Sequence, residues 1–262
     1  MIKEIVDLKI VFFTNRSSHG CEILKSIIER GLRIQSIIIE VQGTEKVPKR
    51  ICNSIKSRGL IETLKIILAE FIMNIGISSI QRKEWHKIKF YNKFSDKIYT
   101  VKNFNSLECE NLLKMLSPDI IVLGGSRILK KNIINIPRIG IINAHPGYLP
   151  KYRGVDVIPW AIYNGDNVGV TVHLIDENID SGLIIDRQFI SMEQGDTIDS
   201  LRKKTELLSG KMIADLLIKF DKEGKLDHII EADGDGTVYH RMPKSLLKEA
   251  RIRLMENAKW KK

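Results

Sequence analysis

Apolar runs of strand length alternate with helix-like segments along the first part of the chain. Leu8–Thr14 and Ile34–Val41 are short apolar runs, and Cys21–Arg30 between them repeats its apolar residues at helical spacing. Such runs are typical of strands that are buried on both faces of a sheet. The order strand, helix, strand therefore predicts a βαβ unit that opens a parallel sheet.

The pattern continues and predicts a single α/β fold. Further strands are expected at Ile98–Val101, Asp119–Leu123, Ile139–Ile142, Gly169–Asp176 and Leu183–Ile190. Helices are expected at Leu60–Ile75, Asn105–Met115, Thr197–Phe220 and Lys244–Met255. The apolar face of the helix Asn105–Met115 would be formed by Leu107, Leu112, Leu113 and Met115. We predict a Rossmann-like, mostly parallel sheet flanked by helices in residues 1–220, with residues 221–262 as a short, basic C-terminal extension.

Charge adds a question about partners. The 262 residues carry a net charge of +10, concentrated in the segments 44–59, 81–99 and 241–262. A positive excess favours anionic partners such as nucleotides, phosphates, nucleic acid or a membrane surface, although ordinary decoration of the surface by lysine explains it equally well. The loop 15–20 lacks the glycines of dinucleotide and P-loop motifs, so a standard nucleotide site is not expected there.

Cysteine usage and hydropathy point to a protein of the reducing cytoplasm. Cys21, Cys52 and Cys109 are far apart and form no CxxC pair, which disfavours disulfides and a zinc site, so we expect no metal. Charged residues interrupt the first apolar run, and we therefore expect no cleavable signal. No apolar stretch approaches the roughly 18 residues of a membrane helix, so no membrane partner is expected.

The segment 143–185 carries the candidate chemistry. Asn143 and His145 stand just past the strand Ile139–Ile142, where ligands bind in open parallel sheets. Pro146 and Gly147 break the backbone there, so we expect the His145 side chain to be presented from a turn. Asp180 lies in a second polar loop beside Gly182. An amide, an imidazole and a carboxylate that converge at a sheet edge suit acyl transfer, because the first two can donate to a developing oxyanion while the carboxylate orients the imidazole.

The ordered motifs of this segment resemble those of the folate-dependent formyltransferases. They are Asn143-Ala144-His145-Pro146, Leu149-Pro150-Lys151-Tyr152-Arg153-Gly154, Asn164-Gly165, Gly169-Val170-Thr171-Val172-His173 and Asp180-Ser181-Gly182-Leu183-Ile184-Ile185. As an ordered set they are highly specific. The resemblance spans about residues 8–220, strongly in the second half and by topology alone in the first.

This resemblance implies the catalytic residues and the co-substrate. Asn143, His145 and Asp180 would form the catalytic triad, and N10-formyltetrahydrofolate would donate the formyl group to an amine. The folate would bind the loop after the strand Asp119–Leu123 and the loop that holds the aspartate, through Ser126, Arg127, Ile128, Leu129, Ile175, Asp176 and Ile179. His173, on a predicted strand, is interpreted as structural.

Several alternatives within and outside the family stay open. A deformylase, with water as acceptor, is disfavoured because the first strand near Leu8 leaves no room for a preceding regulatory domain. Methionyl-tRNA formyltransferase is disfavoured because residues 221–262 are too few for its C-terminal barrel, so we do not expect tRNA as a partner. Glycinamide ribonucleotide and hydroxyornithine remain candidate acceptors. A non-enzymatic basic module that binds nucleotides or nucleic acid is the alternative outside catalysis.

The sugar N-formyltransferases resemble the chain most, around residues 126–129 and 159–162. The acceptor would then be an amino sugar linked to a nucleoside diphosphate, used in the biosynthesis of surface polysaccharide such as lipopolysaccharide. A basic surface attracts such dianions. Asn15, Arg16, Ser17, Tyr239 and Arg241 are the candidate acceptor-binding residues. A homodimer is left open.

Overall fold

The computed structural model describes residues 8–41, 88–224 and 236–256. Its strands are β1 (Ile10–Thr14), β2 (Ser36–Glu40), β3 (Ile98–Val101), β4 (Ile120–Gly124), β5 (Gly140–His145), β6 (Tyr152–Gly154), β7 (Gly169–Leu174), β8 (Ile184–Phe189) and β9 (Thr237–Tyr239). Its helices are α1 (Ser18–Glu29), α5 (Ile88–Tyr91), α6 (Leu107–Leu116), α7 (Lys131–Ile134), α8 (Val157–Tyr163), α9 (Ile198–Glu223) and α10 (Lys244–Glu256). The expected helix Leu60–Ile75 and the basic segment 44–59 lie outside the described residues.

Seven strands form one sheet in the order β3-β2-β1-β4-β5-β7-β8. The pairs from β3 to β5 are parallel, and β7 and β8 extend the sheet in antiparallel fashion. Because the chain passes from β1 outward to β2 and later returns to β4 on the other side, the strand order reverses between β1 and β4. The fold is therefore the mostly parallel, Rossmann-like sheet that the sequence predicts, and its carboxyl edge is the place for a ligand.

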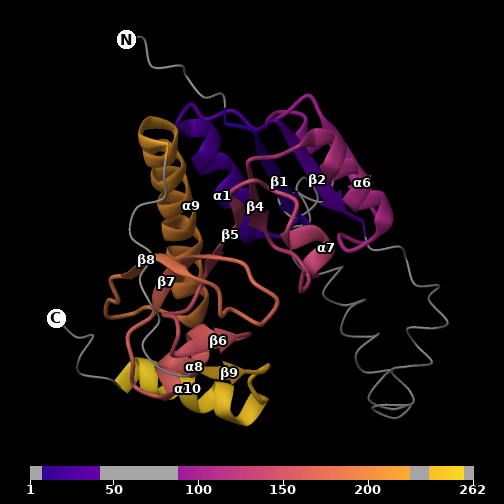
Figure 1. Cartoon of the computed structure of the whole chain (residues 1–262). Helices are drawn as coiled ribbons and strands as arrows, with labels where there is room; N and C mark the ends of the chain where they lie inside the picture. The colour runs from indigo at the N-terminus through magenta and orange to yellow at the C-terminus, as the bar shows by residue number, and fades with distance from the viewer. Residues whose placement is uncertain (1–7, 42–87, 225–235, 257–262) are drawn as a thin grey trace.

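Helices cover both faces of this sheet (Figure 1). Along β1, Ile10 and Phe12 join the apolar core under α1 and α9, whereas Val11 and Phe13 join the core under α6 and α7. Alternate residues of a strand point to opposite faces, so a fully apolar strand is what a sheet covered on both sides requires. All five residues of β1 are buried.

The expected elements that fall within the described residues are present, with bounds that agree to within a few residues and two corrections. β5 continues through Asn143 to His145, because β7 pairs with it antiparallel at Asn143–His173 and at His145–Thr171. These two residues thus belong to the strand and do not follow it. On α6, Leu107 and Met115 are exposed, while Cys109, Leu113 and Leu116 are buried, because positions i, i+4 and i+7 share one side of a helix.

A second, smaller core joins the C-terminal segment to the sheet domain. β9 pairs in parallel with β6, and α10 packs against α8 in a cluster that includes Tyr152, Met242 and Leu254. In Figure 1 these four elements lie together below the main sheet. β6, α8 and β9 are not expected from the sequence. α9 continues to Glu223, three residues past the expected end of the first domain.

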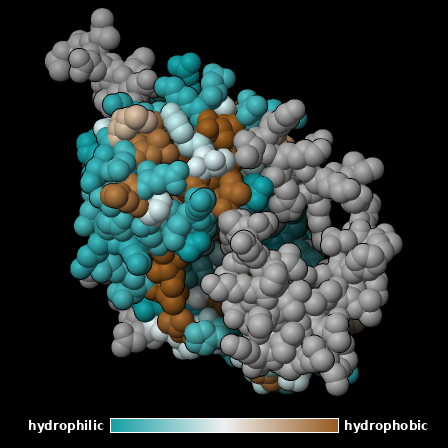
Figure 2. Space-filling view, turned by 90° about the vertical axis from the view of Figure 1, so that its right-hand side faces the viewer, coloured by the Kyte–Doolittle hydropathy of each residue, from teal (hydrophilic) through white to brown (hydrophobic). Residues whose placement is uncertain are grey.

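The surface on the α6 side is mainly hydrophilic with scattered apolar side chains, as the coloured part of Figure 2 shows. Leu107 and Met115 are among the exposed apolar residues of the molecule. Among the helices that the structure describes, none combines the length and the apolar character that a bilayer span requires.

Candidate active site

The three residues expected to form the catalytic triad meet at the carboxyl edge of the sheet. Asn143 and His145 lie two residues apart on β5, and Asp180 follows β7 in the loop that leads to β8. Nδ1 of His145 is 3.4 Å from Oδ2 of Asp180. Across the β5–β7 ladder, Nδ2 of Asn143 is 3.2 Å from Nε2 of His173. The site therefore brings together four polar side chains, one more than the sequence predicts.

Backbone geometry fixes the carboxylate of Asp180. This residue has a left-handed φ of 47°, and its Oδ2 accepts a hydrogen bond of 2.8 Å from the backbone N–H of Gly154. Two residues on, a Cβ at Gly182 would lie 1.9 Å from the carbonyl oxygen of Leu174, so only glycine lets the loop close against β7. The carboxylate is thus held toward the imidazole without help from a flexible side chain.

The imidazole of His145 is buried, at 4% exposure, and has an acceptor at each nitrogen. Nε2 donates to the backbone carbonyl of Tyr152 over 2.8 Å, and Nδ1 faces Asp180. Because Nε2 carries the proton of the hydrogen bond to Tyr152, Nδ1 is the ring nitrogen left to exchange a proton with Asp180. The arrangement can therefore hold a proton between His145 and Asp180, which is what a site that moves protons needs.

His173 is the fourth member of this cluster, and its place on a predicted strand indicates only a structural role. Its ring is fully buried, and Nδ1 donates to the carbonyl of Leu174 over 2.9 Å, which leaves Nε2 to accept from Asn143. Burial, joined by the nearby His145, lowers the pKa of His173 to about 4, although Asp180 acts in the opposite direction. A neutral His173 therefore fixes the orientation of the Asn143 amide. The signal that finds it is the strand register, which the sequence does not contain.

The residues expected to bind folate lie on two braced loops at the same edge. Arg127 donates to the buried Glu40 over 2.6 Å, and the carbonyl of Ile128 accepts from Asn105 over 2.9 Å. Leu129 is 3% exposed and packs in the core, so it can offer a ligand only its backbone. Ser126 hydrogen-bonds locally, to the Arg127 carbonyl.

The second of these loops runs from Ile175 to Asp180. The backbone N–H of Ile175 donates to Ile141 over 2.8 Å, which extends the sheet by one more contact. The carboxylate of Asp176 accepts from Ser181 and from the N–H of Asn178. Ile179 is 39% exposed at the tip. A role of either loop in folate binding stays a prediction.

The residues expected to bind the acceptor are spread over two places. Asn15, Arg16 and Ser17 follow β1, where the Ser17 hydroxyl is already used to cap α1 and to contact Gly124. Tyr239 stacks on Tyr152 with ring centroids 5.3 Å apart and also contacts Trp160, so it packs β9 onto the domain. Arg241 is exposed. Their role as a binding set stays a prediction.

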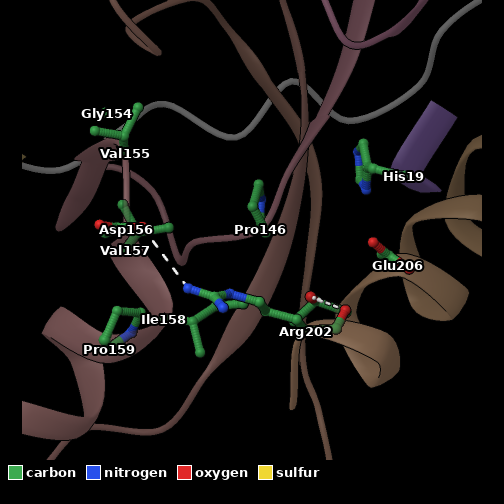
Figure 3. A pocket seen from close by; sticks show the side chains of 11 residues that line it. His19, Pro146, Gly154, Val155, Asp156, Val157, Ile158, Pro159, Arg202 and Glu206 are labelled. Carbon is green, nitrogen blue, oxygen red and sulfur yellow. Dashed lines mark hydrogen bonds and ion pairs between the residues drawn. The ribbon is translucent and has the colours of Figure 1, made fainter. Parts of the chain in front are cut away.

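A cavity of about 310 Å³, which the sequence does not predict, lies beside the polar cluster. Its walls are His19, Pro146, Gly154, Val155, Asp156, Val157, Ile158, Pro159, Arg202, Thr205 and Glu206. Figure 3 shows His19 of α1 and Glu206 of α9 together on one side and Asp156 on the other, with Arg202 reaching between them. Nη2 of Arg202 is 3.8 Å from Oδ1 of Asp156. The cavity adjoins the cluster because Pro146 follows His145 and the N–H of Gly154 holds Asp180.

The described residues contain no group of three or more His, Cys, Asp or Glu side chains that could hold a metal ion. Cys21 and Cys109 are free thiols within the cores.

Fold and cluster together define an α/β protein with a candidate acyl-transfer site at its sheet edge. Residues 9–217 match the family model described as Formyl transferase, which covers well over half of the chain. The chain therefore belongs to the formyl transferase family, as its motifs indicate.

Curated relatives share the formyltransferase part of the chain. A methionyl-tRNA formyltransferase of Ehrlichia ruminantium is 36% identical over 126 residues, which are 47% of this chain and 42% of that protein. The bifunctional polymyxin resistance protein ArnA of Wigglesworthia glossinidia brevipalpis is 34% identical over 174 residues, 65% of this chain and 25% of that protein. The matched region thus spans less than half the length of these relatives. Because relatives of the chain are named methionyl-tRNA formyltransferase, the expectation that tRNA is not a partner has no support.

Solved structures share the fold. A phosphoribosylglycinamide formyltransferase of Bacillus halodurans superposes with a TM-score of 0.54 at 20% identity, over 84% of this chain and 100% of that one. A sugar N-formyltransferase of Shewanella superposes with a TM-score of 0.56 at 12% identity, over 96% and 89%. At these identities the likeness concerns the fold alone.

Proposed function

We propose that this protein transfers a formyl group from N10-formyltetrahydrofolate to a primary amine, with Asn143, His145 and Asp180 at the reacting centre. The observation that carries the proposal is the meeting of these three side chains at the carboxyl edge of the sheet, with 3.4 Å between His145 and Asp180. Membership in the formyl transferase family supports the reaction type.

The loops around Asp180 fit a reduced folate in their chemistry. Ile128 and Ile179 are 63% and 39% exposed on the two loops at this edge, and apolar side chains suit the faces of a flat heteroaromatic ring. Backbone N–H and C=O groups of residues 126–129 and 175–180 would pair with the ring's polar edge. The bound donor supplies an activated formyl carbon.

Each residue of the cluster then has a task. As the amine attacks the formyl carbon, one C–N bond forms, the bond to the donor nitrogen breaks, and one proton passes from the amine to the leaving nitrogen. Asn143 gives one N–H to His173 and directs the other at the formyl oxygen, where negative charge develops. The Asp180 carboxylate, which faces His145, accepts the amine proton directly or through water and returns it to the leaving nitrogen.

For the acceptor, we propose the amino group of a nucleotide-linked amino sugar. The cavity beside Pro146 has the size of a small-molecule site, about 300–1,000 Å³. It offers the acceptors Glu206 and Asp156 to hydroxyl or amino groups and the guanidinium of Arg202 to a phosphate. Met242, next to Arg241, donates its backbone N–H to Asp156 over 3.0 Å, so the C-terminal segment borders this cavity. We place the reaction in the cytoplasm, in surface polysaccharide biosynthesis.

Methionyl-tRNA is the second candidate acceptor. Relatives named methionyl-tRNA formyltransferase are 36% identical over nearly half of the chain, and the net charge of +10 suits a polyanion.

A panel of amines with N10-formyltetrahydrofolate as donor separates these candidates. The full chain is incubated with amino sugars linked to UDP, dTDP and GDP, with glycinamide ribonucleotide, with hydroxyornithine and with methionyl initiator tRNA. Product mass shows which amine gains a formyl group, and each sugar is matched by its hydroxyl analogue as a control. We expect formylation of one nucleotide-linked amino sugar and of none of the analogues. Formylation of methionyl-tRNA alone would overturn the choice of acceptor, and release of formate without any acceptor would indicate a deformylase.

A further inference from the structure

We propose that His19 is a positioning residue that holds the end of β5, and with it Asn143 and His145, in the reactive arrangement. Its Nε2 lies 3.0 Å from the backbone carbonyl oxygen of Ala144, the residue between these two. The inference goes beyond the proposed function but rests on it, because positioning matters only if β5 carries the chemistry.

The end of β5 needs such a partner. β4 and β5 pair only as far as Val122–Ile142, so Ala144 lies beyond the last pair on its β4 side, while β7 pairs with β5 on the other side. Ala144 itself is buried, at 1% exposure, and a buried carbonyl without a hydrogen-bond partner destabilises the fold. The imidazole N–H of His19 therefore replaces the backbone donor that a longer β4–β5 pairing would supply to the Ala144 carbonyl.

The start of α1 is built to bring His19 to this position. A Cβ at Gly20 would lie 2.2 Å from the carbonyl oxygen of Gly124, so glycine is what lets the first turn of the helix approach the end of β4. Ser17 caps the helix and donates its hydroxyl to the same carbonyl over 3.0 Å. On the other side, Ser18 donates to Glu206 of α9 over 2.6 Å. Ser17 and Ser18, which precede His19, thus fix the start of α1 against both β4 and α9.

The protonation of His19 agrees with this role. Its Nε2 must carry the proton to donate to a carbonyl, which leaves Nδ1 as the acceptor nitrogen of a neutral ring. Burial lowers the pKa of His19, while the Ala144 contact and Glu206 act against that shift. The ring also lines the cavity, beside Glu206 (Figure 3), and the same ring contacts Ala144 of the strand that carries the chemistry.

Two substitutions separate positioning from simple packing. His19→Leu removes the donor, whereas His19→Gln keeps an amide N–H that reaches about as far as Nε2. Ile27→Val is the matched control, because it trims the core face of the same helix without touching the first turn. Steady-state kinetics with formyl-folate and the best amine give kcat and both KM values. In parallel, NMR of ¹⁵N-labelled imidazoles reports which nitrogen of His19 carries the proton, with no substrate present.

We expect His19→Leu to lower kcat by about 10- to 100-fold, since misplacement of a reacting group by about 1 Å costs up to about 100-fold. Both KM values should stay within about twofold, and His19→Gln should recover kcat to within about threefold of the wild type. The proposal is overturned if His19→Leu keeps normal kcat, if glutamine is no better than leucine, or if the ring carries its proton on Nδ1 alone. Failure of the wild type to formylate any amine refutes the proposed function instead, and the NMR result still decides the contact with Ala144.

Discussion

The close approach of α1 to β4 leads to a prediction for the substitution Gly20→Ala. The new Cβ would lie 2.2 Å from the carbonyl oxygen of Gly124, where separations below 3.0 Å essentially never occur. The helix start and the strand end must therefore separate by about 1 Å, which weakens the hydrogen bond from Ser17 to Gly124. Overpacking costs about 1–3 kcal/mol. The lost hydrogen bond adds about 1 kcal/mol, while the better helix propensity of alanine returns up to about 1 kcal/mol.

We therefore expect Gly20→Ala to lower the free energy of unfolding by about 1–3 kcal/mol, or the melting temperature by roughly 2–12 °C for a domain of this size. Urea unfolding followed by circular dichroism measures it. The control is Glu29→Ala on the exposed last turn of α1, which should leave stability within about 0.5 kcal/mol of the wild type. A Gly20→Ala variant as stable as the wild type would show that the contact with Gly124 does not constrain the helix.

Two more predictions concern the start of α9 and the C-terminal segment. Burial alone would raise the pKa of Asp196, but hydrogen bonds from Lys204, the N–H of Glu193 and Ser200 outweigh it and lower that pKa below its usual 3.8. The ionised Asp196 therefore stabilises the fold above pH 3.8, and this stabilisation is lost as the pH falls through the lowered pKa. The urea midpoints of the wild type and of Asp196→Asn should differ at pH 6 and converge at pH 2. A difference that stays constant over this range would contradict the prediction. Arg241→Ala should raise KM for a nucleotide-linked sugar by about tenfold, because a hydrogen bond to a charged group contributes about 1.5 kcal/mol. KM for formyl-folate should stay unchanged. Equal changes in both KM values would show that Arg241 is not part of the acceptor site.

The framework of the fold could be predicted because its strands and helices show local patterns of apolar residues. The strand Ile98–Val101 has the expected bounds, and the apolar run of β1 reflects a sheet covered on both faces. What escaped prediction depends on distant pairing. β6 and β9 are three residues each and pair across more than 80 positions, so neither has a periodicity of its own. β5 extends to His145 only because β7 pairs with it.

The candidate site follows the same division. Asn143, His145 and Asp180 stand in an ordered set of motifs, and their convergence could be expected from strand ends. His173 needed the register of the β5–β7 ladder. His19 needed a contact between residues 125 positions apart, and the cavity wall brings α1 to Glu206 across 188 positions. No local pattern encodes such contacts, because packing of whole elements decides them.

The turnover of Asp180→Asn, with N10-formyltetrahydrofolate and the amine identified by the panel, tests whether this cluster is the catalytic site. The asparagine keeps an oxygen for the N–H of Gly154 but lacks the charge that faces His145. Asp186→Asn, an exposed carboxylate on β8, is the matched control. We expect kcat to fall by about 10²–10⁴-fold in Asp180→Asn, with an unchanged melting temperature and a control that turns over like the wild type. Turnover of Asp180→Asn within threefold of the wild type would contradict the assignment of this cluster as the catalytic site.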